Sequence, residues 1–251
     1  MDLDEAASIG GFFALRAAAP ADTSADTSAS ASATHRPLAE VYAGDHAPLA
    51  DRVARVGARL RTDEFRVAAS IAHLGLAARL WSVALGPAAL YGEFPDVTPG
   101  TLRWDGARTS PDDLWWTGAR TRPGTADAIR ETVQYGHLVP LAEALRAAGP
   151  VSPRLLWGNA GSALAGALRE LTRWARREGR PQVAERAAEL TTALFAHPDL
   201  AGTVHGRALR RRTCCLYYRC PGGGLCGDCV FDRPPSPPGG RSGLAAEYSA
   251  P

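Results

Sequence analysis

All five cysteines of this 251-residue chain lie between Cys214 and Cys229, and the 213 residues before them contain none. Cysteines that staple a fold through separate disulfides are not expected to gather in this way. Cys226 and Cys229 form a C-x-x-C pair, whose spacing lets two thiolates bind one metal. Cys214 and Cys215 are neighbours, and adjacent side chains point apart in extended backbone. That pairing suits a multi-metal cluster better than a single tetrahedral ion, so the C-terminal segment is predicted to bind a metal.

Several metal sites use four cysteine ligands, namely [2Fe–2S] and [4Fe–4S] clusters and structural zinc. A zinc-stabilised interaction or nucleic-acid-binding module would use the arginines of residues 207–219 as its basic surface. A disulfide-stapled tail is the weakest alternative, because the cysteine count is odd. Gly227 and the glycines of residues 222–224 are expected to take positive φ and bring backbone N–H groups to sulfur. Such hydrogen bonds tune the reduction potential of a cluster.

The order C-C-x10-C-x2-C, with Leu-Tyr-Tyr-Arg and Pro-Gly-Gly-Gly between the pairs, closely resembles the C-terminus of the FhuF-like ferric-siderophore reductases. The stretches 67–90 and 155–168 look like the helical body of that family, so the resemblance covers roughly residues 37–232. In that family four cysteines ligate a [2Fe–2S] cluster that reduces iron(III) in hydroxamate-type siderophores after import. The resemblance thus implies a ligand set at the matching positions, which are Cys214, Cys215, Cys226 and Cys229.

The implied reaction passes one electron to siderophore-bound Fe(III) and releases Fe(II) in the cytoplasm. The implied partners are a ferric siderophore of the hydroxamate type and an electron donor such as a ferredoxin or a flavin reductase. No acid, base or nucleophile is required, and the rest of the chain shows no catalytic constellation. A cluster-bearing redox sensor is the remaining alternative, and it would reduce ferric chelates poorly.

Cys220 departs from the family pattern, which has a non-cysteine residue at this position. Three interpretations of Cys220 are open from the sequence: an inert thiol, an alternative ligand, or a site that oxidises in air. We expect it not to be a ligand, because four other cysteines already complete two tetrahedral irons.

Charged and aromatic residues surround the cysteines. A four-thiolate cluster is anionic, so nearby guanidinium groups would favour its reduction and would also attract an acidic electron donor. Tyrosines beside the cluster would shield it or line a siderophore surface. The candidates for tuning or docking are Arg211, Arg212, Tyr217, Tyr218 and Arg219.

Composition excludes other classes of function. All 28 basic residues are arginine, and the net charge is only +2, so nothing in the overall balance favours nucleic acid or an anionic membrane. The N-terminus lacks the positive region of a secretory signal. Residues 67–90 are apolar over the length of a membrane span but contain His73 and Arg79 near the middle. A central arginine costs about 2.5–3.5 kcal/mol on insertion. The stretch is therefore predicted to be a buried helix, with no membrane span and a cytoplasmic location.

Apolar residues at helical spacing predict helices over residues 47–60, 64–85, 138–148, 153–177 and 181–195. Gly86-Pro87 is expected to end the second helix. Residues 101–104 and 113–117 are rich in tryptophan and predict a β-hairpin. The expected fold class is mainly α (α+β), a helical body with a small antiparallel sheet and a cysteine-rich C-terminal segment.

Composition also suggests four regions. They are a flexible N-terminal segment with an Ala/Ser/Thr-rich loop (1–36), a mainly helical body (37–205), the [2Fe–2S]-binding motif (206–232) and a disordered Pro/Gly-rich tail (233–251).

Overall fold

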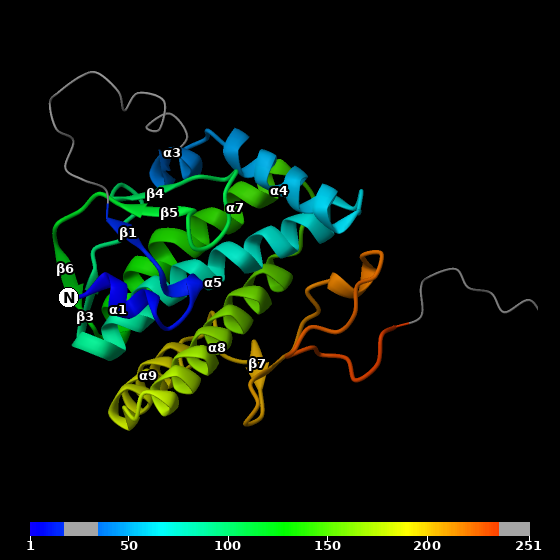
Figure 1. The fold of residues 1–251 in the computed structure, drawn as a ribbon. Helices are drawn as coiled ribbons and strands as arrows, with labels where there is room; N and C mark the ends of the chain where they lie inside the picture. Colours follow the sequence, from blue (N-terminus) through cyan, green and yellow to red (C-terminus); the bar gives the residue numbers. More distant parts are fainter. Residues whose placement is uncertain (18–34, 236–251) are drawn as a thin grey trace, which may run out of the picture.

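The computed structural model describes residues 1–17 and 35–235. The loop predicted over residues 18–34 and residues 236–251 of the predicted tail lie outside this range. A helical body dominates the described part, with small sheets at its edge and the cysteine-rich segment on one side (Figure 1). The predicted fold class, mainly α with a little β, is confirmed.

The centre of the body is helix α5 (Phe65–Tyr91), of which 20 of 27 residues are buried. It packs along α8 (Pro153–Arg177), and α4 (Ala47–Leu60) and α9 (Pro181–Phe195) flank the pair. The indole N–H of Trp81 donates to the carbonyl of Ala160 at 3.1 Å and ties α5 to α8. The predicted helices 47–60, 153–177 and 181–195 are confirmed, because each carries an unambiguous apolar stripe.

Helix α5 does not end at Gly86-Pro87, contrary to the prediction. Pro87 lies inside the helix, and the chain leaves the helix only at Gly92, where φ is +75°. Gly86 serves packing instead, because a Cβ there would lie 2.6 Å from the ring of Phe13. By length and composition α5 is the one described helix able to cross a membrane, and 78% of its apolar window is buried in the protein.

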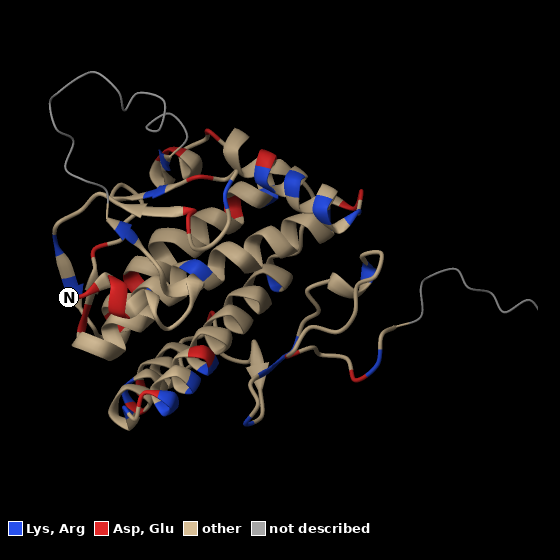
Figure 2. Ribbon diagram, in the orientation of Figure 1, with Lys and Arg blue, Asp and Glu red and all other residues tan. Residues whose placement is uncertain are grey.

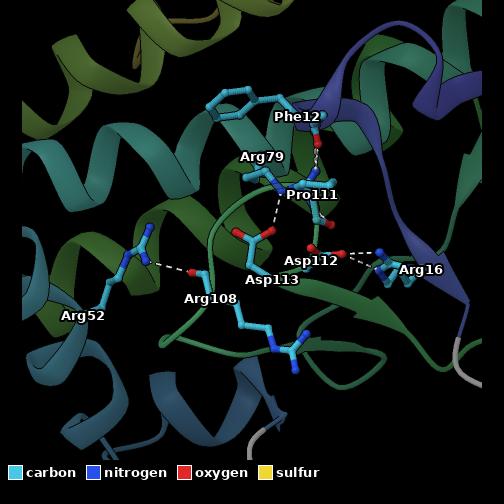
Figure 3. A network of polar contacts seen from close by, with 9 residues as sticks. Phe12, Arg16, Arg52, Arg79, Arg108, Pro111, Asp112 and Asp113 are labelled. Carbon is cyan, nitrogen blue, oxygen red and sulfur yellow. Dashed lines mark hydrogen bonds and ion pairs between the residues drawn. The ribbon is translucent and has the colours of Figure 1, made fainter.

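The first seventeen residues are folded, which corrects the expectation of a flexible segment for this part of residues 1–36. They form α1 (Leu3–Ala7) and the 3-10 turn η1 (Gly11–Phe13), and Phe13 is buried against α5. Arg79 of α5 holds this segment in place (Figure 3). Its guanidinium donates to the carbonyl of Phe12 at 2.6 Å and pairs with Asp113 at 2.8 Å. These partners allow a charged side chain inside an apolar helix.

The main sheet has four short strands in the order β1-β5-β4-β2. The predicted hairpin is confirmed as β4 (Leu102–Trp104) paired antiparallel with β5 (Leu114–Trp116). Strand β2 (Arg36–Pro37) is antiparallel to β4, whereas β1 (Arg16–Ala17) runs parallel to β5. The sheet is therefore mixed, because the N-terminal segment adds a strand that composition did not predict. Strands β3 (Glu93–Pro95) and β6 (Thr121–Pro123) form a separate antiparallel pair.

The helix predicted from residue 138 begins twelve residues earlier. It runs from α6 (Ala126–Ile129) through the π-helical stretch η2 (Arg130–Leu138) into α7 (Val139–Ala148). Pro140 suggested a helix start, but here the chain enters α7 from the wider π-helix. The short helix α3 (Leu38–Tyr42) packs against α7.

Candidate metal centre in the C-terminal segment

The cysteines lie in the C-terminal segment, residues 206–232, which contacts α8 and the start of α5 (Figure 1). Strands β7 (Val204–His205) and β8 (Arg210–Arg211) form a hairpin at its beginning, and the 3-10 turn η3 (Tyr217–Arg219) lies near its middle. No long element runs through the rest of the segment. Its shape is therefore set by turns and by contacts with the two long helices.

The structure brings together the four cysteines of the predicted ligand set. The sulfurs of Cys215 and Cys226 lie 3.7 Å apart. The thiol of Cys214 interacts with that of Cys215, and the thiol of Cys229 interacts with that of Cys226. The four thiols therefore form one continuous group although ten residues separate the two pairs in the sequence.

The separation of the Cys215 and Cys226 sulfurs fits two thiolates bound to one metal. Two thiolates at about 2.3 Å from one tetrahedral metal lie about 3.8 Å apart, and the Cys215–Cys226 separation is close to this value. Among residues 1–17 and 35–235, no three His, Cys, Asp or Glu side chains are arranged to hold a single ion. A [2Fe–2S] cluster needs only two protein sulfurs for each iron, so a pairwise arrangement suits it.

Backbone N–H groups donate to several of the cysteine sulfurs. The N–H of Leu216 lies 3.2 Å from Sγ of Cys214, and that of Phe231 lies 3.4 Å from Sγ of Cys229. The donors are thus not the glycines that we expected. Of those glycines only Gly222 has a positive φ, +72°, and it shapes the turn after Cys220.

The thiols shift one another's pKa values. The hydrogen bond with Cys215 lowers the pKa of Cys214 to about 7, and the Leu216 N–H and the charge of Arg211 act in the same direction. The pKa of Cys226 is raised, first by its contact with Cys215 and then by burial. Without a metal the group therefore resists complete ionisation, and metal binding would have to release the remaining protons.

Arg211 is a buried cation beside this group. Its side chain is fully buried, and one guanidinium nitrogen, Nη2, donates to the amide oxygen of Asn159. Its Nε and Nη1 have no hydrogen-bond partner within the described residues. Burying an unpaired charge is expensive, and this charge acts on the thiols of Cys214, Cys215 and Cys226. An anionic cluster on the four cysteines would supply the counter-charge, so the residues present fit the group that the resemblance implies.

The C-terminal segment packs directly on the backbone of helix α8 at two of the glycines of this helix. A Cβ on Gly158 would lie 1.7 Å from Oγ1 of Thr213, and a Cβ on Gly161 would lie 2.1 Å from Oγ1 of Thr203. The helix backbone and the segment can therefore touch only where glycine stands. One turn away, Ser162 donates to the carboxylate of Asp228 at 2.5 Å, and both residues are buried.

A second buried contact links the cysteines to α5. The hydroxyl of Ser70 donates to the carbonyl of Cys215 at 2.8 Å. The side-chain amide of Asn159 donates to the Ser70 carbonyl at 2.8 Å, and its oxygen accepts from Arg211. The cysteines are thus held to both central helices by one polar network. The sequence analysis did not predict the roles of Ser70, Asn159, Ser162 and Asp228. Polar residues beside glycines on a buried helix face could have indicated that another segment packs there.

The predicted arginines differ in their surroundings. Arg212 is exposed, whereas the guanidinium of Arg219 pairs with Glu64 at the start of α5, at 2.7 Å. Arg210, which the sequence also places among the arginines around the cysteines, contacts one of them directly. Its Nε and Nη2 donate to the carbonyl of Cys229 at 3.0 and 2.7 Å. Arg210 therefore fixes the last cysteine to the β7–β8 hairpin.

The two tyrosines and Cys220 lie at the edge of the group. Tyr217 and Tyr218 are half-buried in η3, and the ring of Tyr218 meets Phe231 edge-on at 5.8 Å. Cys220 is buried, and burial together with the charge of Glu64 raises the pKa of its thiol. Its immediate ionic neighbour is thus a carboxylate of α5.

Comparison with known families gives two matches in this chain. Residues 103–215 match the family described as ferric iron reductase FhuF-like transporter. Residues 211–231 match the FhuF 2Fe-2S C-terminal domain, which contains all five cysteines. The second match decides the cofactor in favour of a [2Fe–2S] cluster and against zinc.

Among curated proteins, the chain is similar to the ferric siderophore reductase of Escherichia coli (strain K12), with 33% identity over 112 residues. The similarity covers 40% of this chain and 40% of that protein. The chain therefore matches less than half the length of this relative. The family resemblance predicted from the cysteine motif is confirmed by the two family matches. Across residues 103–231 the chain belongs to the FhuF-like family of [2Fe–2S] proteins.

Proposed function

We propose that this protein reduces Fe(III) bound to a siderophore, with Cys214, Cys215, Cys226 and Cys229 as the ligands of its [2Fe–2S] cluster. The observation that carries the proposal is the group of four contacting thiols beside the fully buried Arg211. The E. coli relative is named a ferric siderophore reductase, which supports the same substrate class. The hydroxamate type is taken from the family resemblance.

When bound, the cluster supplies a one-electron couple. The chain's own residues set how readily it accepts an electron. Arg211 places a positive charge in a buried environment, and the N–H groups of Leu216 and Phe231 donate to two of the sulfurs. Each of these interactions is stronger with the more negative, reduced state, so together they raise the reduction potential.

The overall reaction balances with one electron and no bond to a protein side chain. A reduced ferredoxin or flavin reductase gives up one electron, and the siderophore-bound Fe(III) becomes Fe(II). Hydroxamate oxygens are hard ligands that suit the smaller and more highly charged Fe(III), so Fe(II) leaves the chelator more easily. The exposed arginines of the C-terminal segment, among them Arg207 and Arg212, suit an acidic electron donor (Figure 2).

We place the reaction in the cytoplasm. None of the five cysteines, all of which lie within the described residues, is in a disulfide, which suits a reducing compartment. The apolar helix α5 is mostly buried by the rest of the fold. Cys214 and Cys226 are only half-buried, so an oxidising compartment would leave them open to oxidation.

Anaerobic purification tests this proposal at its first step. We expect absorption between about 400 and 600 nm, two irons and two sulfides per chain, and an S = 1/2 EPR signal after reduction with dithionite. Stoichiometric zinc in a colourless protein that cannot be reconstituted with iron and sulfide would refute it.

A further inference from the structure

An open hollow of about 790 Å³ lies beside the cysteines. It is formed where α5 and α8 begin and where the C-terminal segment crosses them. Binding sites for small molecules commonly have volumes of about 300–1,000 Å³. Its walls are mainly apolar, with polar and charged groups at the edge, and they include Phe65, Leu155, Leu216, Glu64, Arg66 and Ser152.

Leu216 connects the hollow to the candidate metal centre. Its side chain lines the hollow, and its backbone N–H donates to the sulfur of Cys214 at 3.2 Å. Its φ is +68°, a left-handed conformation that costs a leucine about 1–2 kcal/mol. Such strain persists where the surroundings require it, and here the conformation sets both the sulfur contact and the wall of the hollow.

Two guanidinium groups compensate the single carboxylate at the edge of the hollow. Glu64 accepts from Arg66 at 3.0 Å and pairs with Arg219 at 2.7 Å. Apolar walls with a compensated ion group suit a ligand of low net charge. A ferric tris-hydroxamate has this property, because three hydroxamate anions neutralise Fe(III). A tris-catecholate of Fe(III) keeps a charge of about −3, and placing that charge against the apolar walls would cost far more than placing a neutral complex there.

We infer that this hollow binds the ferric hydroxamate chelate and that Leu216 separates the bound chelate from Cys214. The inference rests on the proposed function and adds the place where the substrate sits. A neighbouring hollow of about 550 Å³ shares Glu64 and Phe65 and extends along α4. It offers room for the organic arms of the chelator. The chelate would then lie within van der Waals contact of Leu216, whose N–H is hydrogen-bonded to the sulfur of Cys214. This contact would shorten the path of the electron from the cluster to the iron.

The test uses the Ga(III) complex of desferrioxamine B, which has the charge and shape of the ferric complex but accepts no electron. Ser152 lines the hollow, is exposed and makes no side-chain capping bond at the start of α8, so Ser152→Trp fills the hollow without disturbing the core. Gln182 is also exposed, in the first turn of α9, and Gln182→Trp is the matched control. We expect Ser152→Trp to weaken binding of the gallium complex at least tenfold in calorimetry, with wild-type affinity in Gln182→Trp.

A second variant examines Leu216 itself. Leu216→Gly relieves the left-handed strain and removes the apolar wall, so we expect an intact cluster EPR signal together with weaker gallium-complex binding. No measurable binding to the wild type, or equal binding by wild type and Ser152→Trp, would overturn the inference. The proposed function fails separately, if the wild type binds the gallium complex at this hollow but the reduced protein does not reduce the ferric complex.

Discussion

At the scale of single residues, the five cysteines divide into four that contact one another and one that lies apart. Cys220 is buried near Glu64, whereas Cys226 lies 3.7 Å from Cys215 within the thiol group. Two irons with bridging sulfides need four protein ligands, and the contacting group has that number of thiols. The two kinds of position should therefore respond differently to removal of the sulfur.

We expect Cys220→Ser to retain two irons and two sulfides per chain and an unchanged EPR spectrum. Cys226→Ser should lose most of the iron, because serine is a poor substitute for a thiolate in such a cluster. Iron and sulfide assays on both purified variants check this prediction. Loss of the cluster in Cys220→Ser, with retention in Cys226→Ser, would mean that the ligand set is assigned wrongly.

Arg211 acts on the cluster through its charge. Replacing it in Arg211→Met removes a buried cation, so the reduction potential should fall on the order of 50 mV, close to the ~59 mV that equals a tenfold change for one electron. Arg211→Lys keeps the charge and should stay nearer the wild-type potential. EPR-monitored redox titration measures both. Equal potentials in all three proteins would show that Arg211 is only a packing residue.

At the scale of elements, the C-terminal segment packs on α8, and the glycines of this helix have distinct roles. Gly158 faces Thr213, while Gly166 faces open surface with only the tip of Arg169 at 3.7 Å. The same substitution therefore has opposite consequences at two positions of one helix.

Gly158→Ala should displace the segment and lower the iron content at least several-fold, while the circular dichroism of the helices is preserved. Gly166→Ala should keep the cluster and stabilise the protein by about 0.5–1 kcal/mol, the ordinary gain for alanine in a helix. Iron analysis and thermal unfolding of the two variants compare them directly. A full cluster in Gly158→Ala would contradict this close packing of the segment on α8.

Some of the helices and strands could be predicted from the sequence, and others could not. Helices with a clear apolar stripe, such as α4 and α9, were predictable to their ends. Pro87 and Pro140 misled the prediction, because buried helical surroundings tolerate a proline inside α5 and a π-helical stretch leads into α7. The N-terminal strand β1 was not predictable, because its pairing with β5 joins residues about a hundred positions apart.

The ligand set of four cysteines is a prediction from the motif, whereas the contacts around these cysteines required the fold. Nothing local marks Ser70 or Asp228 as contacts of the C-terminal segment, since both depend on how that segment lies across α5 and α8. That Nε and Nη1 of Arg211 have no partner among the described residues is likewise visible only in three dimensions.

At the scale of the whole molecule, α5 joins two buried polar networks. Arg79 holds the N-terminal segment at the middle of the helix, and Ser70 holds Cys215 near its start. The stability of the body and the position of the metal centre are thus linked through one helix. Buried histidines on the same body make its stability depend on pH.

His137 is one such histidine. Its Nε2 lies 2.6 Å from the carbonyl of Val97 and its Nδ1 lies 3.0 Å from the hydroxyl of Tyr42, so the neutral ring is hydrogen-bonded on both sides. Burial lowers its pKa from 6.5 to about 4. Below pH 6.5 the unfolded chain takes up a proton that the folded chain refuses, so folding stability falls as the pH drops from 6.5 towards 4.

Between pH 7 and pH 5 this residue should cost about 2 kcal/mol of unfolding free energy, at about 1.4 kcal/mol per pH unit. His137→Gln is expected to be less stable at pH 7 but to lose less stability on acidification than the wild type. Urea unfolding at both pH values provides the comparison. An equal loss in the two proteins would indicate that His137 is already charged in the folded state.

Electron transfer to a ferric chelate is most directly tested by stopped-flow mixing. The dithionite-reduced protein, freed of excess reductant, is mixed anaerobically with ferric desferrioxamine B and a strong Fe(II) chelator. We predict that the EPR signal of the reduced protein disappears as one Fe(II) per chain is captured, and that Cys226→Ser yields none. A protein that carries its cluster but stays reduced in the presence of the ferric complex would contradict the proposed function.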